Sequence, residues 1–401
     1  MQRLSGGRVF IAGELQEADL FFDEQIRAIG SDPEFDAAEP LDVGGKIVLP
    51  GLIDVHVHFR DFRQAYQETW ASGARAALQG GVTTVLEMPN SDPPTLTLKT
   101  LRAKRARAEA AGVRFGLYGG LTENNIELIP LLAPEVAAFK LYLGQTTGGL
   151  IVSDPGALRE MFAAVAESGK LLAVHAQRPQ SRSEAADLEP ALELSDRYHT
   201  RLHLCHCRTR EGIELALEAR RDGLDLSIET CPHYLHFTQQ DFQQQGALLK
   251  VNPPLASAAD REYLWDALAK GQIDILASDH APHTLEEKAQ ALERAPYGLP
   301  GVETTLPLML DAVSKEKLTL ARLVEVFSTN PARRFGLEGQ GQIAVGHDAD
   351  LVVVDPTRRQ TVAPERLASK CGWSPFEGFE LTGWPIRTWV RGRLSYAAPA
   401  P

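Results

Sequence analysis

Two histidines and an arginine occupy alternate positions in one apolar stretch, where they could bind a metal and an anion. His56, His58 and Arg60 lie in the run Gly51-Leu-Ile-Asp-Val-His-Val-His-Phe-Arg60. Residues i and i+2 of a strand point to the same face, so the three side chains should emerge on one side. Paired imidazoles suit a divalent metal such as zinc, and a neighbouring guanidinium suits an anionic substrate. Taken alone, the pair is equally consistent with two hydrogen-bonded histidines on an ordinary strand.

Polar residues able to bind a metal or a substrate recur at the ends of further apolar runs. They are Asn90, Lys140, His175, His206, Glu229, His233, Asp279 and His283. The carboxyl ends of parallel barrel strands meet at one face, where barrel enzymes carry their active sites. Chance placement of the 11 histidines would scatter them over helices and loops as well. The clustering therefore favours a shared metal site.

The part of the chain that carries these residues alternates between apolar runs and helical patterns. The runs are Leu52–Phe59, Thr83–Pro89, Arg114–Leu121, Ala137–Leu143, Leu171–Gln177, Arg201–Cys207, Asp225–Leu235 and Asp274–Pro282. Helical spacing marks Glu68–Gln79, Leu98–Ala111, Gly156–Ser168, Glu211–Arg221 and Ala259–Ala269, whereas the helix after Thr122 is poorly marked. Eight such repeats predict a (β/α)8 TIM-like barrel over residues 50–337. Residues 1–49 and 338–401 suggest short strands, which we expect to pair into a small composite β-sandwich domain.

Lys140 is expected to point into the barrel, where a charged ammonium is costly. Beside two divalent cations its pKa should fall, leaving a neutral amine that can add CO₂. The resulting carbamate is a bidentate anion able to bridge two metals. The position of Lys140 is also consistent with an unmodified lysine, whose ammonium group reaches the barrel rim or pairs with Glu229 or Asp279.

Asp279 is the best candidate for the general acid/base. It lies on the last predicted strand, where a carboxylate could be a metal ligand and also accept a proton from a nucleophilic water. The alternative is a turn aspartate before His280, which we expect to pack beside the site rather than react.

Composition excludes several classes of partner. The chain has 401 residues and a formal net charge of −12, with no dense Lys/Arg cluster, so we expect no nucleic-acid partner. No apolar stretch approaches the roughly 18 residues of a membrane span. The four cysteines form no disulfide framework, which favours the cytoplasm. In Cys205-His206-Cys207, strand alternation should turn both thiols away from the His206 side.

Together these motifs resemble the amidohydrolase superfamily, and specifically the dihydroorotases. The resemblance covers about residues 45–395. Its motifs are Gly51–Arg60, Glu87-Met-Pro-Asn90, Lys140-Leu-Tyr-Leu, Val174-His-Ala, His203-Leu-Cys-His206, Glu229-Thr-Cys-Pro-His233, Lys250-Val-Asn-Pro-Pro254, Ala277-Ser-Asp-His-Ala-Pro-His-Thr-Leu-Glu-Glu-Lys288, Pro300-Gly-Val-Glu-Thr304 and Ser374-Pro-Phe-Glu-Gly378.

The resemblance implies an activity and a role for each matching residue. The activity is the reversible hydrolysis of (S)-dihydroorotate to N-carbamoyl-L-aspartate in pyrimidine biosynthesis, by a metal-bridging hydroxide with Asp279 as general acid/base. His56, His58 and Asp279 would hold one zinc, His175 and His206 a second, and carboxylated Lys140 would bridge them. Arg60, Asn90 and His283 would bind the substrate carboxylate, while Asn252 and the backbone at Pro300 and Gly301 would contact the ring. A third metal at Glu229 and a mobile lid at residues 144–149 are weaker implications.

Two alternatives remain at this point. A hydantoinase, dihydropyrimidinase or allantoinase would share the metal site but act on rings without the same carboxylate, and Arg60, Asn90 and His283 argue against it. A catalytically silent homologue could instead be a scaffold for aspartate transcarbamoylase. We expect a small-molecule substrate and a homodimer, with association with aspartate transcarbamoylase as a further possibility.

Overall fold

A barrel of eight parallel strands forms the centre of the molecule. The computed structural model describes residues 1–32, 34–35, 39–144, 149–178 and 183–399. Neighbouring strands follow chain order from β8 to β15, and a parallel bridge between Val57 and His280 closes the ring. The strands are β8 Leu52–Val57, β9 Val82–Glu87, β10 Arg114–Gly120, β11 Ala138–Tyr142, β12 Leu172–His175, β13 Leu202–Leu204, β14 Leu226–Thr230 and β15 Ile275–Leu276.

Helices surround this barrel, as the spacing of Ala and Leu predicts. The five predicted helices correspond to α1 Trp70–Gln79, α2 Leu98–Glu109, α4 Pro155–Glu167, α6 Arg210–Arg221 and α9 Ala258–Ala269. Further helices are α3 Ile129–Leu132, α5 Glu184–Tyr198, α7 Pro232–His236, α8 Gln239–Gln245, α10 Leu285–Lys288, α11 Thr305–Ser314, α12 Leu320–Val324 and α13 Asn330–Phe335. Threonine and serine hydroxyls cap many of their amino ends, for example Thr69 at α1 and Ser257 at α9. None of the described helices is long and apolar enough to span a membrane.

All eight predicted runs contain a barrel strand, but most of the strands are shorter than the runs. The difference lies mainly at the carboxyl ends, where polar site residues leave the sheet and enter loops. The run Asp225–Leu235 continues into α7, because Pro232 begins a helix after the strand ends at Thr230. His56, Lys140 and Glu229 lie within their strands, near the carboxyl ends. The other site residues end a strand or lie in the loops that follow, namely His58, Arg60, Asn90, His175, His206 and Asp279.

The barrel interior is a packed core below the site. Ile53, Leu86, Tyr118 and Ala173 belong to one buried apolar cluster with Phe335 of α13. The Phe335 ring contacts Tyr118, with centroids 6.1 Å apart. This packing closes the amino-terminal end, so the carboxyl face is the open one.

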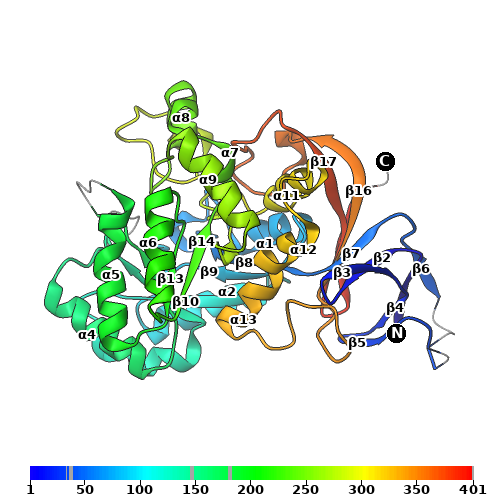
Figure 1. Ribbon diagram of the computed structural model, residues 1–401, viewed down its shortest axis with the longest axis horizontal. Coiled ribbons are helices and arrows are strands. Elements are labelled where there is room, and N and C mark those ends of the chain that lie inside the picture. The colour runs from blue at the N-terminus through cyan, green and yellow to red at the C-terminus, as the bar shows by residue number, and fades with distance from the viewer. Residues whose placement is uncertain (33, 36–38, 145–148, 179–182, 400–401) are drawn as a thin grey trace.

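Strands from both chain ends form two smaller sheets beside the barrel. One sheet has the order β5-β4-β1-β6, and the other has the order β18-β17-β16-β7-β2-β3. Figure 1 shows the blue amino-terminal strands and the red carboxyl-terminal strands together on one side of the molecule. The pairing agrees with the predicted composite domain, whose boundaries stay a prediction. The strands are β1 Gln2–Ser5, β2 Arg8–Ile11, β3 Glu14–Glu17, β4 Leu20–Phe22, β5 Ile26–Ile29, β6 Pro40–Asp42, β7 Ile47–Pro50, β16 Leu351–Thr361, β17 Glu380–Val390 and β18 Arg393–Ala397.

A buried ion pair supports the carboxyl end of β9. Lys104 Nζ of α2 donates to Glu87, and also to the Met88 carbonyl at 3.0 Å. Both charged side chains are at most 2% exposed. Lys104→Met would leave the Glu87 carboxylate unpaired, so we expect the free energy of unfolding to fall by about 3–5 kcal/mol. Urea denaturation measures this loss.

The double variant Glu87→Gln/Lys104→Met is the matched control, because it removes both charges. We expect it to recover much of the stability. A Lys104→Met protein as stable as the wild type would show that the pair does not hold this strand end.

Candidate metal and substrate site

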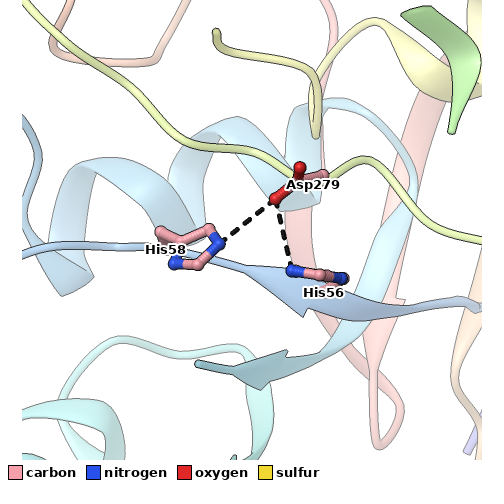
Figure 2. Close-up of side chains that lie close together, drawn as sticks. All are labelled: His56, His58 and Asp279. Atoms are coloured by element: carbon pink, nitrogen blue, oxygen red, sulfur yellow. Dashed lines mark hydrogen bonds and ion pairs between the residues drawn. The ribbon is translucent and has the colours of Figure 1, made fainter. Parts of the chain in front are cut away.

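One carboxylate and two imidazoles meet at the open face of the barrel. Asp279 Oδ1 lies 3.3 Å from His56 Nε2 and 3.1 Å from His58 Nε2. Figure 2 shows the two rings, both carried by the β8 segment, directed toward this carboxylate. Their ligand atoms all lie within 4.8 Å of one another, as a single metal ion requires.

A second pair of imidazoles lies beside the first. His175 Nδ1 is 2.9 Å from His206 Nε2, and the His56 and His206 ring centroids are 5.3 Å apart. Lys140 is fully buried in the barrel, with Nζ 2.8 Å from Cys205 Sγ. All six predicted metal ligands therefore line one pocket.

The protonation of these groups fits metal binding. Burial lowers the pKa of His58 and of His175 to about 3, so both rings are neutral and have a lone pair to offer. Burial opposes a charge on His56 too, but Glu229 and Asp279 raise its pKa to about 10. These two carboxylates therefore favour a positive charge at the position of His56. The buried His206 Nδ1 has no hydrogen-bond partner among the described residues.

Glu229 orients ligands from beneath the site. One of its oxygens accepts from His56 Nδ1 and from the His206 backbone N–H, both at 2.9 Å. The other accepts from His203 Nε2 at 3.0 Å. A carboxylate behind a ligating histidine fixes the tautomer that presents Nε2 to the metal. Both oxygens of Glu229 are thus already used, although Cys205 and His56 lie close enough to form a cluster with it.

The expectation for Cys205 is wrong. Its thiol contacts Lys140 inside the barrel instead of turning away from the site. Strand β13 ends at Leu204, and His206 adopts a positive φ of 42°. Strand alternation therefore no longer applies at residues 205–207.

Glu229→Gln should weaken metal binding without removing a ligand. Loss of the charge that orients His56 is expected to lower metal affinity about 10–100-fold. Metal content after dialysis against a graded chelator measures this. Cys205→Ser is the control and should keep the wild-type metal content. Equal metal loss in both variants would instead indicate a separate metal held by Glu229, Cys205 and His56.

Arg60 places a buried positive charge at the pocket. It is 2% exposed, and its hydrogen-bond partners are the Pro282 carbonyl and His283 Nε2, at 3.4 and 3.1 Å. Within the described parts of the chain it forms no ion pair. Burial lowers the pKa of this guanidinium, but arginine still remains protonated in proteins. A buried cation without a directly paired carboxylate is suited to an anionic ligand.

His283 lies against Arg60 rather than in the pocket lining. Gln67 Nε2 lies 3.1 Å from His283 Nδ1, and His283 Nε2 lies 3.0 Å from the Tyr297 carbonyl. Burial and Arg60 lower the pKa of His283 to about 4, so its ring is neutral. Arg60 can only donate, so in this contact the neutral His283 ring accepts through Nε2. His283 therefore lies between Arg60 and the segment around Tyr297, and direct contact with substrate stays a prediction.

The pocket itself has a volume of about 60 Å³ and brings most of the predicted residues together. Asn90 lies at its edge, with Oδ1 2.7 Å from His58 Nδ1, and Asn252 Nδ2 is 3.3 Å from His175 Nε2. Pro300 and Gly301 do not line it; the Gly301 N–H donates to His280 Nδ1 at 3.1 Å. His280 thus packs beside the site, as expected. Of the predicted lid at residues 144–149, residues 145–148 lie outside the described residues.

Several pocket residues were not singled out from the sequence. Tyr142 is 2% exposed, and its hydroxyl has no hydrogen-bond partner in the described residues. Its position two residues after Lys140 was a usable signal, because both point to the same side of β11. Further lining comes from Val251, Ala281, Tyr297, Gly298 and Leu299, which gave no chemical signal.

Backbone strain coincides with the site. Arg60, His206 and Asp279 have φ values of 57°, 42° and 46°. Side chains other than glycine rarely adopt this left-handed region, and such strain concentrates at functional sites. Each residue leaves its strand at the carboxyl face, where the strained backbone directs the side chain inward.

Buried imidazoles and a carboxylate gathered at the carboxyl face of a barrel form a metal site suited to the hydrolysis of an amide. Residues 47–395 match the amidohydrolase family, and the chain belongs to it. It is 35% identical to a dihydroorotase of Methanosarcina mazei over 96% of this chain and 92% of that protein. It is 40% identical to a dihydroorotase of Pyrococcus horikoshii, over 87% and 81%. The solved L-hydantoinase of Arthrobacter aurescens superposes with a TM-score of 0.93 and 32% identity, covering 98% and 96%.

Proposed function

We propose that this protein is a dihydroorotase, which interconverts (S)-dihydroorotate and N-carbamoyl-L-aspartate in pyrimidine biosynthesis. The observation that carries the proposal is Arg60, a buried guanidinium without an ion pair among the described residues, beside the metal ligands. Dihydroorotate has the ring amide that such a site hydrolyses and a carboxylate that Arg60 can bind. The dihydroorotases with 35–40% identity support the same substrate.

Hydantoinase activity is the competing proposal, because the chain closely matches a solved hydantoinase. The shared barrel and metal ligands do not separate the two activities. A neutral hydantoin ring would leave the Arg60 charge buried and unpaired, which is costly. Arg60 therefore favours the carboxylated ring.

The residues present fit two zinc ions. His56, His58 and Asp279 would hold the first, and His175 and His206 the second. Lys140, once carboxylated, would bridge them, because its buried amine lies in the same pocket and, among the described residues, hydrogen-bonds only to Cys205. When bound, the metals would lower the pKa of water and polarise the scissile carbonyl.

Residues of the chain itself bind the substrate and transfer the proton. Arg60 binds the substrate carboxylate, supported by Asn90 and His283, and thereby orients the ring. Asn252 and the Tyr142 hydroxyl lie where they can donate to ring oxygens. In the hydrolytic direction Asp279 accepts a proton from the attacking water and delivers it to the leaving ring nitrogen. In ring closure Asp279 returns the proton by the reverse path.

Incubating the purified chain with dihydroorotate and quantifying N-carbamoyl-L-aspartate tests this function. We expect turnover in both directions and about two zinc ions per chain. A silent scaffold for aspartate transcarbamoylase would give neither product nor bound metal.

We further propose a cytoplasmic homodimer that can associate with aspartate transcarbamoylase. The resemblance to dihydroorotases supports this assembly. Light scattering of the purified chain, with and without the transcarbamoylase, measures both associations. A monomer that does not associate with the transcarbamoylase would contradict this proposal.

A further inference from the structure

Lys288 is a buried lysine whose hydrogen bonds within the described residues are all to backbone carbonyls. It ends α10 and is 2% exposed. Its Nζ donates to the carbonyls of Gly298 at 2.8 Å, Pro296 at 3.1 Å and Lys250 at 3.2 Å. No carboxylate of the described residues pairs with it. Burial, together with Lys250, lowers its pKa to about 7, and Glu287 opposes this shift. The three carbonyl oxygens are its hydrogen-bond acceptors, and the centroid of the Trp373 ring lies 5.9 Å from Nζ.

Lys250 binds the same loop from the other side. Its Nζ donates to the carbonyls of Leu292 and Ala295, both at 2.6 Å. Its own carbonyl accepts from the Gly298 N–H at 2.9 Å, in addition to Lys288. Two ammonium groups therefore hold four carbonyl oxygens of the segment 292–298.

The segment 289–299 needs such support because, apart from Ala295 and Leu299, it packs little apolar surface. Residues 289–294 are exposed, and Tyr297 is 40% exposed. On one side Tyr297, Gly298 and Leu299 line the catalytic pocket. On the other side a separate cavity of about 570 Å³ includes Leu292, Lys250 and Tyr297 in its lining. The segment is thus a thin wall between two spaces.

Gly298 lies very close to Ala281, so the segment 289–299 must be held accurately in place. Its φ is +124°, and a Cβ there would lie 2.7 Å from both the Cβ and the carbonyl oxygen of Ala281. The wall therefore lies directly against the strand-eight loop that carries Asp279 and His283. A small shift of this wall would alter the pocket without moving a metal ligand.

We propose that Lys288 and Lys250 are positioning residues that fix the 296–299 wall of the pocket and thereby determine how tightly the carboxylated ring binds. Their ammonium groups form hydrogen bonds to backbone carbonyls and, among the described residues, to none of the metal ligands. Their carbonyl bonds join two pocket-lining segments, Val251–Asn252 and Tyr297–Leu299. This inference rests on the proposed function for its substrate, but not for the loop positioning itself.

The test compares Lys288→Met with the wild type in KM, kcat, metal content and hydrogen exchange. Losing the ammonium bonds should raise KM for dihydroorotate about tenfold or more, with kcat within about threefold and metal content unchanged. Amide exchange should rise in peptides covering 289–299 and not in the barrel strands. Lys288→Arg keeps the charge and donors, so we expect it to recover part of the KM.

Two further variants keep the test decisive. Lys250→Met removes the other ammonium and should raise KM in the same way, even if Lys288→Met folds poorly. Lys270→Met removes an exposed lysine paired with Asp266 and should leave KM unchanged. Unaltered KM and unaltered exchange at 289–299 in both Lys288→Met and Lys250→Met would overturn the proposal. A wild type inactive on dihydroorotate, with exchange still raised in the variants, would overturn the proposed function and leave the loop positioning supported.

Discussion

Asp279→Asn is expected to lower kcat for dihydroorotate about 10²–10⁴-fold or more, because one residue supplies both a metal ligand and the acid/base. Its carboxylate lies 3.3 and 3.1 Å from His56 and His58. These imidazoles hold its pKa below the usual range, although burial opposes the shift. The carboxylate is therefore ionised and able to accept a proton at neutral pH. Steady-state kinetics in both directions measures the loss.

Asp274→Asn is the matched control for this variant. Asp274 lies at the opposite end of the same strand, paired with Arg220, far from the chemistry at the carboxyl face. We expect it to keep kcat near the wild-type value. If Asp279→Asn retained substantial kcat with normal metal content, Asp279 could not be the acid/base.

Arg60→Ala should reduce kcat/KM for dihydroorotate about 10²–10³-fold, since removing one partner of a buried charge pair typically costs several kcal/mol of binding. We expect metal content to stay near wild type, because the hydrogen bonds of Arg60 within the described residues go to Pro282 and His283 and not to the metal ligands. Activity on a neutral cyclic amide should fall much less.

Arg63→Ala is the control, because Arg63 lies in the same loop but its side chain is 80% exposed. It should behave like the wild type. Loss of bound metal in Arg60→Ala would show that Arg60 is structural and would remove the main support for a carboxylated substrate.

The barrel and its metal ligands could be predicted because both follow local rules. The alternation of apolar runs and helices predicts the fold, and the ends of parallel strands converge at one face. His56, His58 and Asp279 meet as expected, although Asp279 lies more than 220 residues from both histidines in the chain. Here strand register alone brings the groups together.

The remaining walls of the pocket depend on tertiary contacts that leave no local signal. The segment 297–299 lines the site, and the Gly298 carbonyl accepts from Lys288 while the Gly298 N–H donates to the Lys250 carbonyl. In the sequence, these two lysines cannot be told from ordinary exposed lysines. Cys205 was misplaced because the sheet ends one residue before it. His283 lies against Arg60 because Gln67 and the Tyr297 carbonyl position its ring.

The most direct test of the central claim is a comparison of dihydroorotate, hydantoin and allantoin as substrates for the purified chain, with zinc quantified in the same sample. We predict that kcat/KM for dihydroorotate exceeds that for either neutral ring by at least about 10²-fold, with about two zinc ions bound per chain. Preferential hydrolysis of hydantoin or allantoin by the metal-loaded protein would contradict the assignment of Arg60 as the residue that selects the substrate.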